Sequence, residues 1–356
     1  MSTVSFSRLE SYRTCSQKFY YKYIQGESRP EPIKDYFIKG DLAHFMLEEI
    51  LTGAEWAEAL TLVLPTWLEN NCRVTIDPDA DLMRKGQALH AESVGRYAEM
   101  VSEILLRCAP NYVGEDPIRN QDGSVPADPL GYPPKIVKQI LNEYGLNEDR
   151  QLIDTTATRL NKEFTPYSLA NIAAEAVFCA RNYSPPDYFG HTVSIEYPIY
   201  PEDHLPVAFQ DDKMWSGYID WIFEMDDGSL VIADHKTSKK RPSGVEVLWH
   251  PQLNLYVGLY YELTGRAAEY IAINHLATNS LVLAKVDLAI VGEQMKIFHQ
   301  LQDAINQSAF VRQFPTGFNS PCLDRDYKTG NVKSLCPYLD RCWPFFLEDI
   351  QDELQK

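Results

Sequence analysis

Two short apolar runs joined by a polar turn most constrain what this chain can fold into. Residues Tyr218–Phe223 and Leu230–Ala233 flank an Asp-Asp-Gly turn, a pattern typical of a β-hairpin. The first run carries Asp220, and the second is followed at once by Asp234 and, two residues later, Lys236. Because side chains two apart on a strand share a face, the last two are expected to lie together. A carboxylate beside an ammonium group suits binding of a hard divalent cation next to a water or phosphate. The alternative is that Asp234 and Lys236 form an ordinary surface ion pair, which has the same spacing.

Two predicted helices could add further groups to this hairpin. The sequence predicts a helix that begins after Gly40, with His44 and Glu48 one turn apart on one face. His44 could supply a nitrogen ligand to a carboxylate site; a packed or solvated histidine is the alternative. Another helix is predicted to begin at a His-Pro pair, with Gln252 and Tyr256 again four residues apart. An ordinary amphipathic helix with outward polar residues also explains that spacing.

The candidate residues of the hairpin and of the two predicted helices occur in a particular order along the chain. The order is Gly40 with His44, then Gly217-Tyr-Ile-Asp220, then Asp234-His-Lys236-Thr, then Gln252-x-x-x-Tyr256. The set resembles the RecB-like branch of the PD-(D/E)XK nuclease superfamily, which includes CRISPR-associated and phage exonucleases. The N-terminal run from Ser5 to Ile24, in which a cysteine precedes a basic and aromatic stretch, is similar to the first helix of that family. The resemblance covers residues 5–50 and 190–345 approximately, and the segment between them matches nothing in the family.

The resemblance implies a metal-dependent hydrolytic site. It assigns His44, Asp220 and Asp234 to the metal ion, and Lys236 to the attacking water. Mg²⁺ or Mn²⁺ would neutralise charge on the phosphoryl oxygens and lower the pKa of a bound water. Oxygen ligands suit both ions, and one histidine is compatible with Mn²⁺ as well as Mg²⁺. Lys236 would favour hydroxide by its charge or accept the proton of the water, and the sequence does not choose between these roles.

Three further residues have supporting roles by the same resemblance. Gln252 and Tyr256 match a helix motif that supports the lysine and the DNA strand. Glu196, in a strand-like run, stands where relatives often have an additional acid. A solvated strand residue is the alternative for Glu196.

The cysteines form a second group of candidates. Seven are present, and an odd number in a chain without a secretory segment disfavours a disulfide framework. Cys72, Cys108 and Cys179 lie in predicted helical surroundings and are expected to be ordinary buried thiols.

The resemblance implies that the remaining four cysteines hold a 4Fe-4S cluster. They are Cys15, Cys322, Cys336 and Cys342. Thirteen residues separate Cys322 from Cys336, whereas many relatives place this pair two residues apart. A Zn²⁺ site built from the same thiolates and unliganded cysteines are the alternatives. A cluster would tie the first helix to the C-terminal lobe.

Composition limits the possible environments and partners. With 356 residues and 45% hydrophobic content, the chain can bury a full core as one large or two small domains. The N-terminus lacks an apolar signal core, and no run approaches the ~18 apolar residues of a membrane span, so a soluble, cytoplasmic protein is expected. The net charge of −17 is unusual for a DNA-binding protein, but basic residues gather within residues 1–40 and after the hairpin. DNA is expected to follow these two groups, the second of which contains Lys239, Lys240 and Arg241.

The pattern of elements, with the resemblance, predicts a restriction-endonuclease-like α/β fold: a mixed sheet flanked by helices, with a large helical insertion and a cysteine-bearing C-terminal lobe. A capping box from Ser7 to Glu10 is expected to start the first helix. Further helices are expected at 41–70, 79–107, 136–145, 166–182 and 289–307, with a long loop at 109–135. Strands are expected at 191–199, 215–224, 229–235, 268–277 and 281–287. Four segments result: N-terminal helices with the first cysteine and the histidine at 1–54, the insertion at 55–190, the nuclease core at 191–290, and the C-terminal helix and cysteine lobe at 291–356.

The resulting functional hypothesis is a metal-dependent DNA exonuclease that acts on single strands or ends in recombination, repair, CRISPR or phage DNA processing. The alternative is a non-cleaving subunit of a helicase–nuclease complex, either binding DNA ends or serving as an iron–sulfur or zinc structural protein. A non-cleaving protein would have no use for the complete set of metal and lysine residues. The chain has no Gly-x-x-x-x-Gly-Lys-Ser/Thr motif, so ATP-driven unwinding would require a helicase partner.

Overall fold

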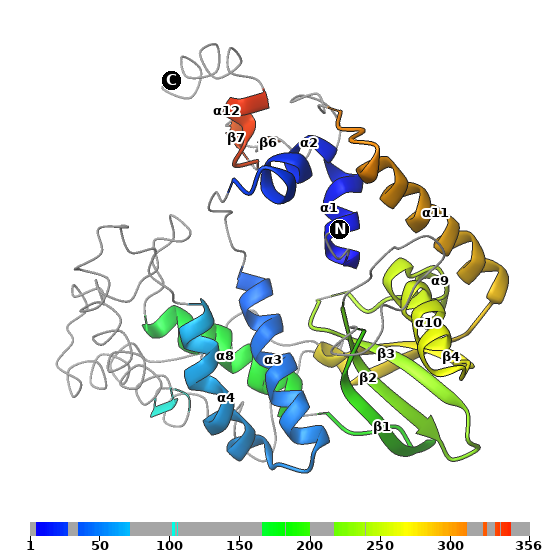
Figure 1. Cartoon of the computed structure of the whole chain (residues 1–356). Helices are drawn as coiled ribbons and strands as arrows, with labels where there is room; N and C mark the ends of the chain where they lie inside the picture. The colour runs from blue at the N-terminus through cyan, green and yellow to red at the C-terminus, as the bar shows by residue number, and fades with distance from the viewer. Residues whose placement is uncertain are drawn as a thin grey trace.

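The computed structural model places a five-stranded mixed sheet between two groups of helices (Figure 1). The structure describes residues 5–27, 35–71, 102–103, 105, 166–181, 183–199, 217–238, 240–311, 323–325, 332–334 and 336–342. The expected helices at 79–107 and 136–145 and the loop at 109–135 fall wholly or largely outside the described residues.

The sheet has the strand order β1-β2-β3-β4-β5. Strands β3 and β4 run parallel, and the other neighbouring pairs are antiparallel. The strand bounds are Phe189–Pro198 for β1, Tyr218–Met225 for β2, Leu230–Lys236 for β3, Tyr270–His275 for β4 and Ser280–Lys285 for β5. The five expected strands are therefore confirmed, with ends displaced by a few residues.

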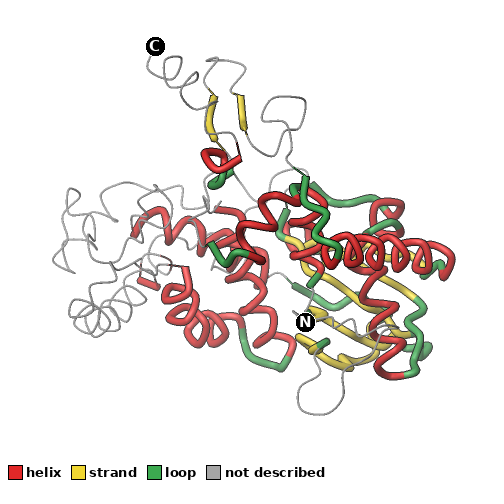
Figure 2. The backbone as a smooth tube through the Cα atoms, turned by 45° about the horizontal axis from the view of Figure 1, so that its top comes forward, coloured by secondary structure: helices red, strands yellow, loops and turns green. Residues whose placement is uncertain are grey.

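The central hairpin forms as its sequence predicts. Strands β2 and β3 pair with Trp221 opposite Ala233, and the turn between them has Gly228 at a φ of 82°. That left-handed conformation favours glycine, because a side chain would meet the following backbone. Figure 2 shows the strands of the five-stranded sheet as one layer.

A helical crossover joins the parallel strands β3 and β4. It consists of α9 (Gly244–Leu248) and α10 (Pro251–Thr264), and α11 (Leu288–Asn306) follows β5. Helices α10 and α11 approach closely at Gly258, where a Cβ atom would lie 3.0 Å from Met295 Sδ. The expected final helix at 289–307 is confirmed by α11.

The two faces of the sheet have separate hydrophobic cores. On β3, Val231 and Ala233 pack with Trp221 on the face that Leu51 of α3 and Tyr183 also cover. Leu230 and Ile232 point the other way, into the core shared with α10 and α11. Each large apolar side chain removed from water contributes about 1.5–3 kcal/mol. Strand β3 is therefore buried on both sides, which explains its nearly continuous apolar sequence.

Helices α3 (Asp35–Leu51), α4 (Trp56–Asn71) and α8 (Pro166–Arg181) form one of the helical groups. A largely buried ion pair joins Lys39 Nζ of α3 to Glu175 Oε2 of α8 at 3.1 Å. The expected start of a helix after Gly40 is wrong, because α3 begins at Asp35 and contains Gly40. The expected single helix at 41–70 is also wrong, because two helices occupy this range. Helix α3 ends at Leu51, α4 begins at Trp56, and Gly53 between them has a φ of 107°. The helix expected at 166–182 is confirmed by α8.

The first helix, α1 (Phe6–Thr14), begins two residues earlier than a cap at Ser7 would place it. Ser5, rather than Ser7, caps it by accepting a hydrogen bond from the Arg8 amide, and Glu10 instead pairs with Arg13. Helix α2 (Ser16–Phe19) and a π-helical turn, η1 (Tyr20–Ile24), follow.

The N-terminal helices also contact the distal part of the chain. The Tyr12 hydroxyl donates a hydrogen bond to the Ala309 carbonyl, and Ser16 Oγ bonds both the amide and the carbonyl of Val311. Farther along, the Tyr338 hydroxyl donates to the Glu27 carbonyl just before α12 (Leu339–Cys342). A small two-stranded sheet, β6 (Leu323–Arg325) with β7 (Val332–Ser334), lies between. No helix within the described ranges is both long and apolar enough to cross a membrane.

Candidate metal and nuclease site

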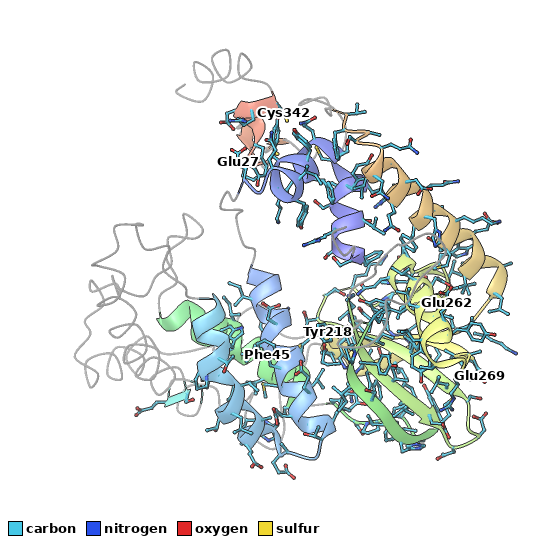
Figure 3. The ribbon with its side chains drawn as sticks, viewed as in Figure 1. Glu27, Phe45, Tyr218, Glu262, Glu269 and Cys342 are labelled. Atoms are coloured by element: carbon cyan, nitrogen blue, oxygen red, sulfur yellow. The ribbon has the colours of Figure 1, made fainter. Side chains whose placement is uncertain are left out.

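Three potential metal ligands converge from three elements. His44 of α3, Glu196 of β1 and Asp220 of β2 each offer a ligand atom, and these atoms all lie within 4.8 Å of one another. His44 Nδ1 lies 3.6 Å from Asp220 Oδ2. Tyr218, labelled in Figure 3, marks the end of β2 from which Asp220 projects. One imidazole nitrogen and two carboxylate oxygens form a donor set compatible with Mg²⁺ or Mn²⁺.

The pairing of β1 with β2 brings the two acids together. Ile195 lies opposite Trp221 and Tyr197 lies opposite Ile219, which places Glu196 across from position 220 of β2. Glu196 has a φ of 48°, in the left-handed region that non-glycine residues rarely adopt. Such a conformation costs about 1–3 kcal/mol and persists where the surrounding structure imposes it. Glu196 is therefore held in a strained backbone position within the ligand group.

The main chain of residue 235 orients the other two ligands. Its N–H donates to Asp220 Oδ2 at 2.9 Å, and its carbonyl lies 3.0 Å from His44 Nε2. A carbonyl oxygen only accepts, so His44 donates from Nε2, and Nδ1 is the nitrogen that faces Asp220. A backbone carbonyl that fixes one histidine nitrogen and leaves the other available is a common arrangement behind metal ligands.

The imidazole of His235 lies on the opposite side of β3 from Asp234 and Lys236. It stacks on Trp221 with 5.9 Å between ring centroids, and Asn274 Nδ2 lies 3.0 Å from its Nδ1. Burial lowers the pKa of His235 well below its ordinary value, and the nearby His44 and Lys236 lower it further. A neutral His235 imidazole therefore accepts the Asn274 amide hydrogen bond, and this fixes the peptide that orients Asp220 and His44.

Asp234 and Lys236 share one face of β3, as their spacing predicts. Lys236 Nζ lies 2.6 Å from Asp234 Oδ2, and the Asp234 side chain is 3% exposed against 40% for Lys236. Asp234 Oδ2 has no partner with hydrogen-bond geometry within the described part of the chain, so this contact is a close ion pair. Burial alone would lower the pKa of Lys236, but the Asp234 carboxylate outweighs it and raises that pKa. The geometric ligand group of three thus contains Glu196 in the place that the sequence assigned to Asp234.

The acids of the ligand group disfavour one another's ionised forms. Burial, followed by the charges of Asp220 and Glu48, raises the pKa of Glu196 to about 7. Burial, followed by the charge of Asp234, raises the pKa of Asp220 to about 6. The pKa of Glu48 is also raised, chiefly by burial. Carboxylates crowded into a poorly solvated space are the environment in which a cation is most favourable.

Helix α10 closes the site from the face of Asp234 and Lys236. Gln252 Nε2 donates to the Tyr256 hydroxyl at 3.0 Å, so these two predicted residues contact each other. Tyr256 is buried rather than solvated, which raises its pKa. A Cβ atom on Gly217 would lie 3.4 Å from the Tyr256 hydroxyl, so glycine allows β2 to begin close to this side chain.

Four residues near the site were not assigned to it from the sequence: Glu48, His235, His250 and Asn274. The pKa of His250 is lowered by burial and also responds to the charges of Asp234 and Lys236, which places it beside that ion pair. The spacing of Glu48 from His44 was a usable signal, since the two are one helical turn apart. No local pattern identifies Asn274, because its contact with His235 depends on the parallel pairing of β3 with β4.

The predicted DNA-binding residues follow β3 in an exposed loop. Lys240 Nζ lies 3.4 Å from Glu246 Oε1, and Arg241 Nε donates to Ser280 Oγ at 3.0 Å. Lys239 lies outside the described residues.

Three of the four predicted cluster cysteines lie in the described part of the chain, and all three are buried. Cys15 caps α2, its Sγ accepting a hydrogen bond from the Lys18 amide at 3.4 Å. Cys336 and Cys342 pack with Tyr21 and Tyr338, so thiols near the two ends of the chain belong to neighbouring elements. In Figure 3, Cys342 and Glu27 lie close together at this junction. Cys322 lies outside the described residues, and Cys179 is buried in α8.

Comparison with known families agrees with this geometry. No curated protein shows a significant match to the chain. The profile of the PD-(D/E)XK nuclease superfamily matches residues 3–112 and 133–342, a span that includes every candidate ligand described above. The mixed five-stranded sheet flanked by helices is the restriction-endonuclease-like fold expected of such a nuclease. The chain therefore belongs to the PD-(D/E)XK nuclease superfamily.

Proposed function

We propose that this nuclease is a metal-dependent DNA exonuclease of the RecB-like branch that acts on single-stranded DNA or DNA ends. The observation that best supports the proposal is the convergence of His44, Glu196 and Asp220 within 4.8 Å, beside the ion pair of Asp234 and Lys236. Burial of several acids together costs free energy, and a bound cation would offset that cost. A protein that only binds DNA has no need of such a group of acids. The ordered sequence motifs support the RecB-like assignment.

His44, Glu196 and Asp220 would hold the divalent cation, Mg²⁺ or Mn²⁺, with Asp234 as a further candidate ligand beside them. The fit rests on the donor set itself: a histidine nitrogen lies beside two partly buried carboxyl groups whose pKa values are both raised, chiefly by burial. A divalent cation at such a site neutralises phosphoryl charge and lowers the pKa of water.

The other side chains of the site would bind the DNA and orient the attacking water. Lys236 places an ammonium group at the end of β3, where it positions the attacking water and counters negative charge on the phosphate. Gln252 and Tyr256, hydrogen-bonded to each other on α10, fix the wall of the site that faces this lysine. The basic loop after β3 contacts the DNA backbone, and a helicase partner would supply single strands.

Cleavage of end-labelled linear DNA tests this function. Wild-type protein is expected to degrade linear single strands in Mg²⁺ or Mn²⁺, and to leave a covalently closed single-stranded circle intact because a circle offers no end. Asp220→Asn serves as the matched variant and should leave both substrates uncut. Equal cleavage of circle and linear strand would replace the exonuclease assignment with an endonuclease, and no cleavage in either metal would reject the nuclease proposal.

We also propose that Cys15, Cys322, Cys336 and Cys342 hold a 4Fe-4S cluster. Burial of the three described thiols, and the packing of Cys336 and Cys342 beside Tyr21 shortly after Cys15, support this reading. Thiolates from both ends of the chain would then be joined through one group, whose binding energy contributes to folding.

Metal analysis of anaerobically purified protein tests the cluster. Cys336→Ser should lose bound iron and the associated visible absorption, whereas Cys179→Ser, which removes a buried thiol of α8, should retain both. Stoichiometric zinc in a colourless protein would establish the zinc alternative. Absence of both metals from the wild-type protein would reject a cysteine-bound metal.

A further inference from the structure

The loop after β3 carries two described basic residues that the structure treats differently. Lys240 Nζ lies 3.4 Å from Glu246, a carboxylate that also caps α9, so its ammonium group has a neighbouring counter-charge. Arg241 is exposed and forms no ion pair among the described residues, and its Nε bonds the neutral hydroxyl of Ser280. The positive charge of Arg241 is therefore held in place without being neutralised.

A chain of hydrogen bonds fixes Arg241 to the sheet. His275 Nε2 lies 2.7 Å from the Ser238 carbonyl, His275 Nδ1 lies 2.7 Å from Thr278 Oγ1, and Thr278 Oγ1 lies 2.8 Å from Ser280 Oγ. The loop is thus attached at two points, through the Ser238 carbonyl and through the Arg241 side chain.

The direction of every bond in this chain follows from its inner end. A carbonyl only accepts, so His275 donates through Nε2 and, being neutral, accepts through Nδ1 from the Thr278 hydroxyl. Burial lowers the pKa of His275, which agrees with a neutral ring. Thr278 then accepts from Ser280, and Ser280 accepts from Arg241 Nε. The two terminal amino groups of the guanidinium remain to bind a ligand, in the forked geometry that matches a phosphate.

Sheet register gives the position of this side chain relative to the candidate site. Lys236 on β3 lies opposite His275 on β4, and His275 lies opposite Ser280 on β5. Neighbouring strands are about 4.8 Å apart, so the anchor of Arg241 lies about 10 Å from Lys236.

We propose that Arg241 is a preorganised binding residue for a backbone phosphate of the DNA strand near the cleaved bond, and that Lys240 is not. This inference rests on the proposed function and specifies how the strand is held. Ser280, Thr278 and His275 act on the phosphate only through Arg241 and are positioning residues.

Binding of a labelled single-stranded oligonucleotide in EDTA, across a series of salt concentrations, tests the proposal without cleavage. Arg241→Ala should weaken binding about tenfold and lower the slope of log K against log salt by about 0.7. Lys240→Ala, an adjacent change with the same loss of charge, should weaken binding less than about twofold. Ser280→Ala keeps the charge but loses the anchor, so it should weaken binding about threefold with the slope unchanged.

Equal effects of Arg241→Ala and Lys240→Ala would overturn the proposal, because net charge alone would then explain the binding. An unchanged affinity of Ser280→Ala would overturn the preorganisation by the hydrogen-bond chain. These outcomes are independent of cleavage, so a wild-type protein that degrades DNA while Arg241→Ala binds normally would reject only this inference. A wild-type protein that binds no oligonucleotide would reject both it and the DNA-directed function.

Discussion

The two halves of the candidate site balance their charges in opposite ways. On the side of α3 and β1, His44 stands beside two acids, Glu196 and Asp220, whose pKa values are raised chiefly by burial, and the charge of Lys236 offsets only part of that rise at Asp220. On the side of β3, Asp234 is neutralised within the protein by Lys236 at 2.6 Å. The first half would be stabilised by a cation from outside, whereas the second has its counter-charge within the protein. The comparison implies that removing a charge should have opposite effects on stability in the two halves.

The largest expected effect is on cleavage by Lys236→Ala. Loss of the ammonium group should lower the rate of DNA cleavage by roughly 100- to 1,000-fold, because it would remove a preorganised charge beside the phosphate. It should also destabilise the fold by about 1–2 kcal/mol, since Asp234 would remain buried without its partner; partial exposure of Lys236 reduces the cost. Single-turnover cleavage and chemical denaturation measure the two effects. Lys296→Ala, which breaks an exposed pair with Glu293, is the control and should change neither.

Asp220→Asn should reverse the sign of the stability effect. In EDTA the variant should melt at a higher temperature than wild type, because one of the crowded acids loses its charge. With saturating Mn²⁺ the order should invert, because the wild type gains binding energy that the variant lacks. Thermal melting with and without Mn²⁺ measures this, and a variant less stable than wild type in EDTA would show that the acids are not mutually destabilising.

A smaller effect is expected behind the ligands. His235→Leu should weaken Mn²⁺ binding by about 10- to 100-fold, because the peptide of residue 235 orients both Asp220 and His44. Calorimetric titration gives the affinity. Val231→Ala removes a buried group from the same face of the same strand and should lower stability without changing Mn²⁺ affinity. Equal affinities in the two variants would reduce His235 to a packing role.

The smallest expected effect isolates the strained backbone of Glu196. Glu196→Gly and Glu196→Gln both remove the carboxylate, but only glycine relieves the φ of 48°. The glycine variant should therefore be more stable than the glutamine variant by about 1 kcal/mol in denaturant unfolding. Equal stabilities would show that the left-handed conformation at this position carries no strain.

Local sequence patterns predicted the sheet and the pairs within single elements. The hairpin, the shared face of Asp234 and Lys236, and the spacing of Gln252 and Tyr256 depend only on the repeat of a strand or a helix, so the structure agrees with them. Helix ends were less predictable. Ser5 rather than Ser7 caps α1, and α3 begins before Gly40 and extends through it, because packing against neighbouring elements outweighs a local start signal.

The composition of the ligand group could not be derived from local patterns. Glu196 enters it through the pairing of β1 with β2 and through a left-handed backbone, and Glu48 approaches it only because α3 packs beside the sheet. The roles of His235 and Asn274 depend on the register of two parallel strands that a helical crossover separates in sequence. Such contacts are tertiary, and no spacing along the chain encodes them.

The contacts between α1 and the residues after α11 delay the folding of α1 during synthesis. The hydrogen bond from Tyr12 to the Ala309 carbonyl spans 297 residues. At a translation rate of about 5–20 residues per second, α1 leaves the ribosome about 15–60 s before this partner exists. The apolar face of α1, including Leu9 and Phe6, must remain exposed or covered by a chaperone during that interval. Helix α1 is thus made long before its native neighbours, and the nascent chain is most vulnerable to aggregation until α11 and the residues that follow it emerge.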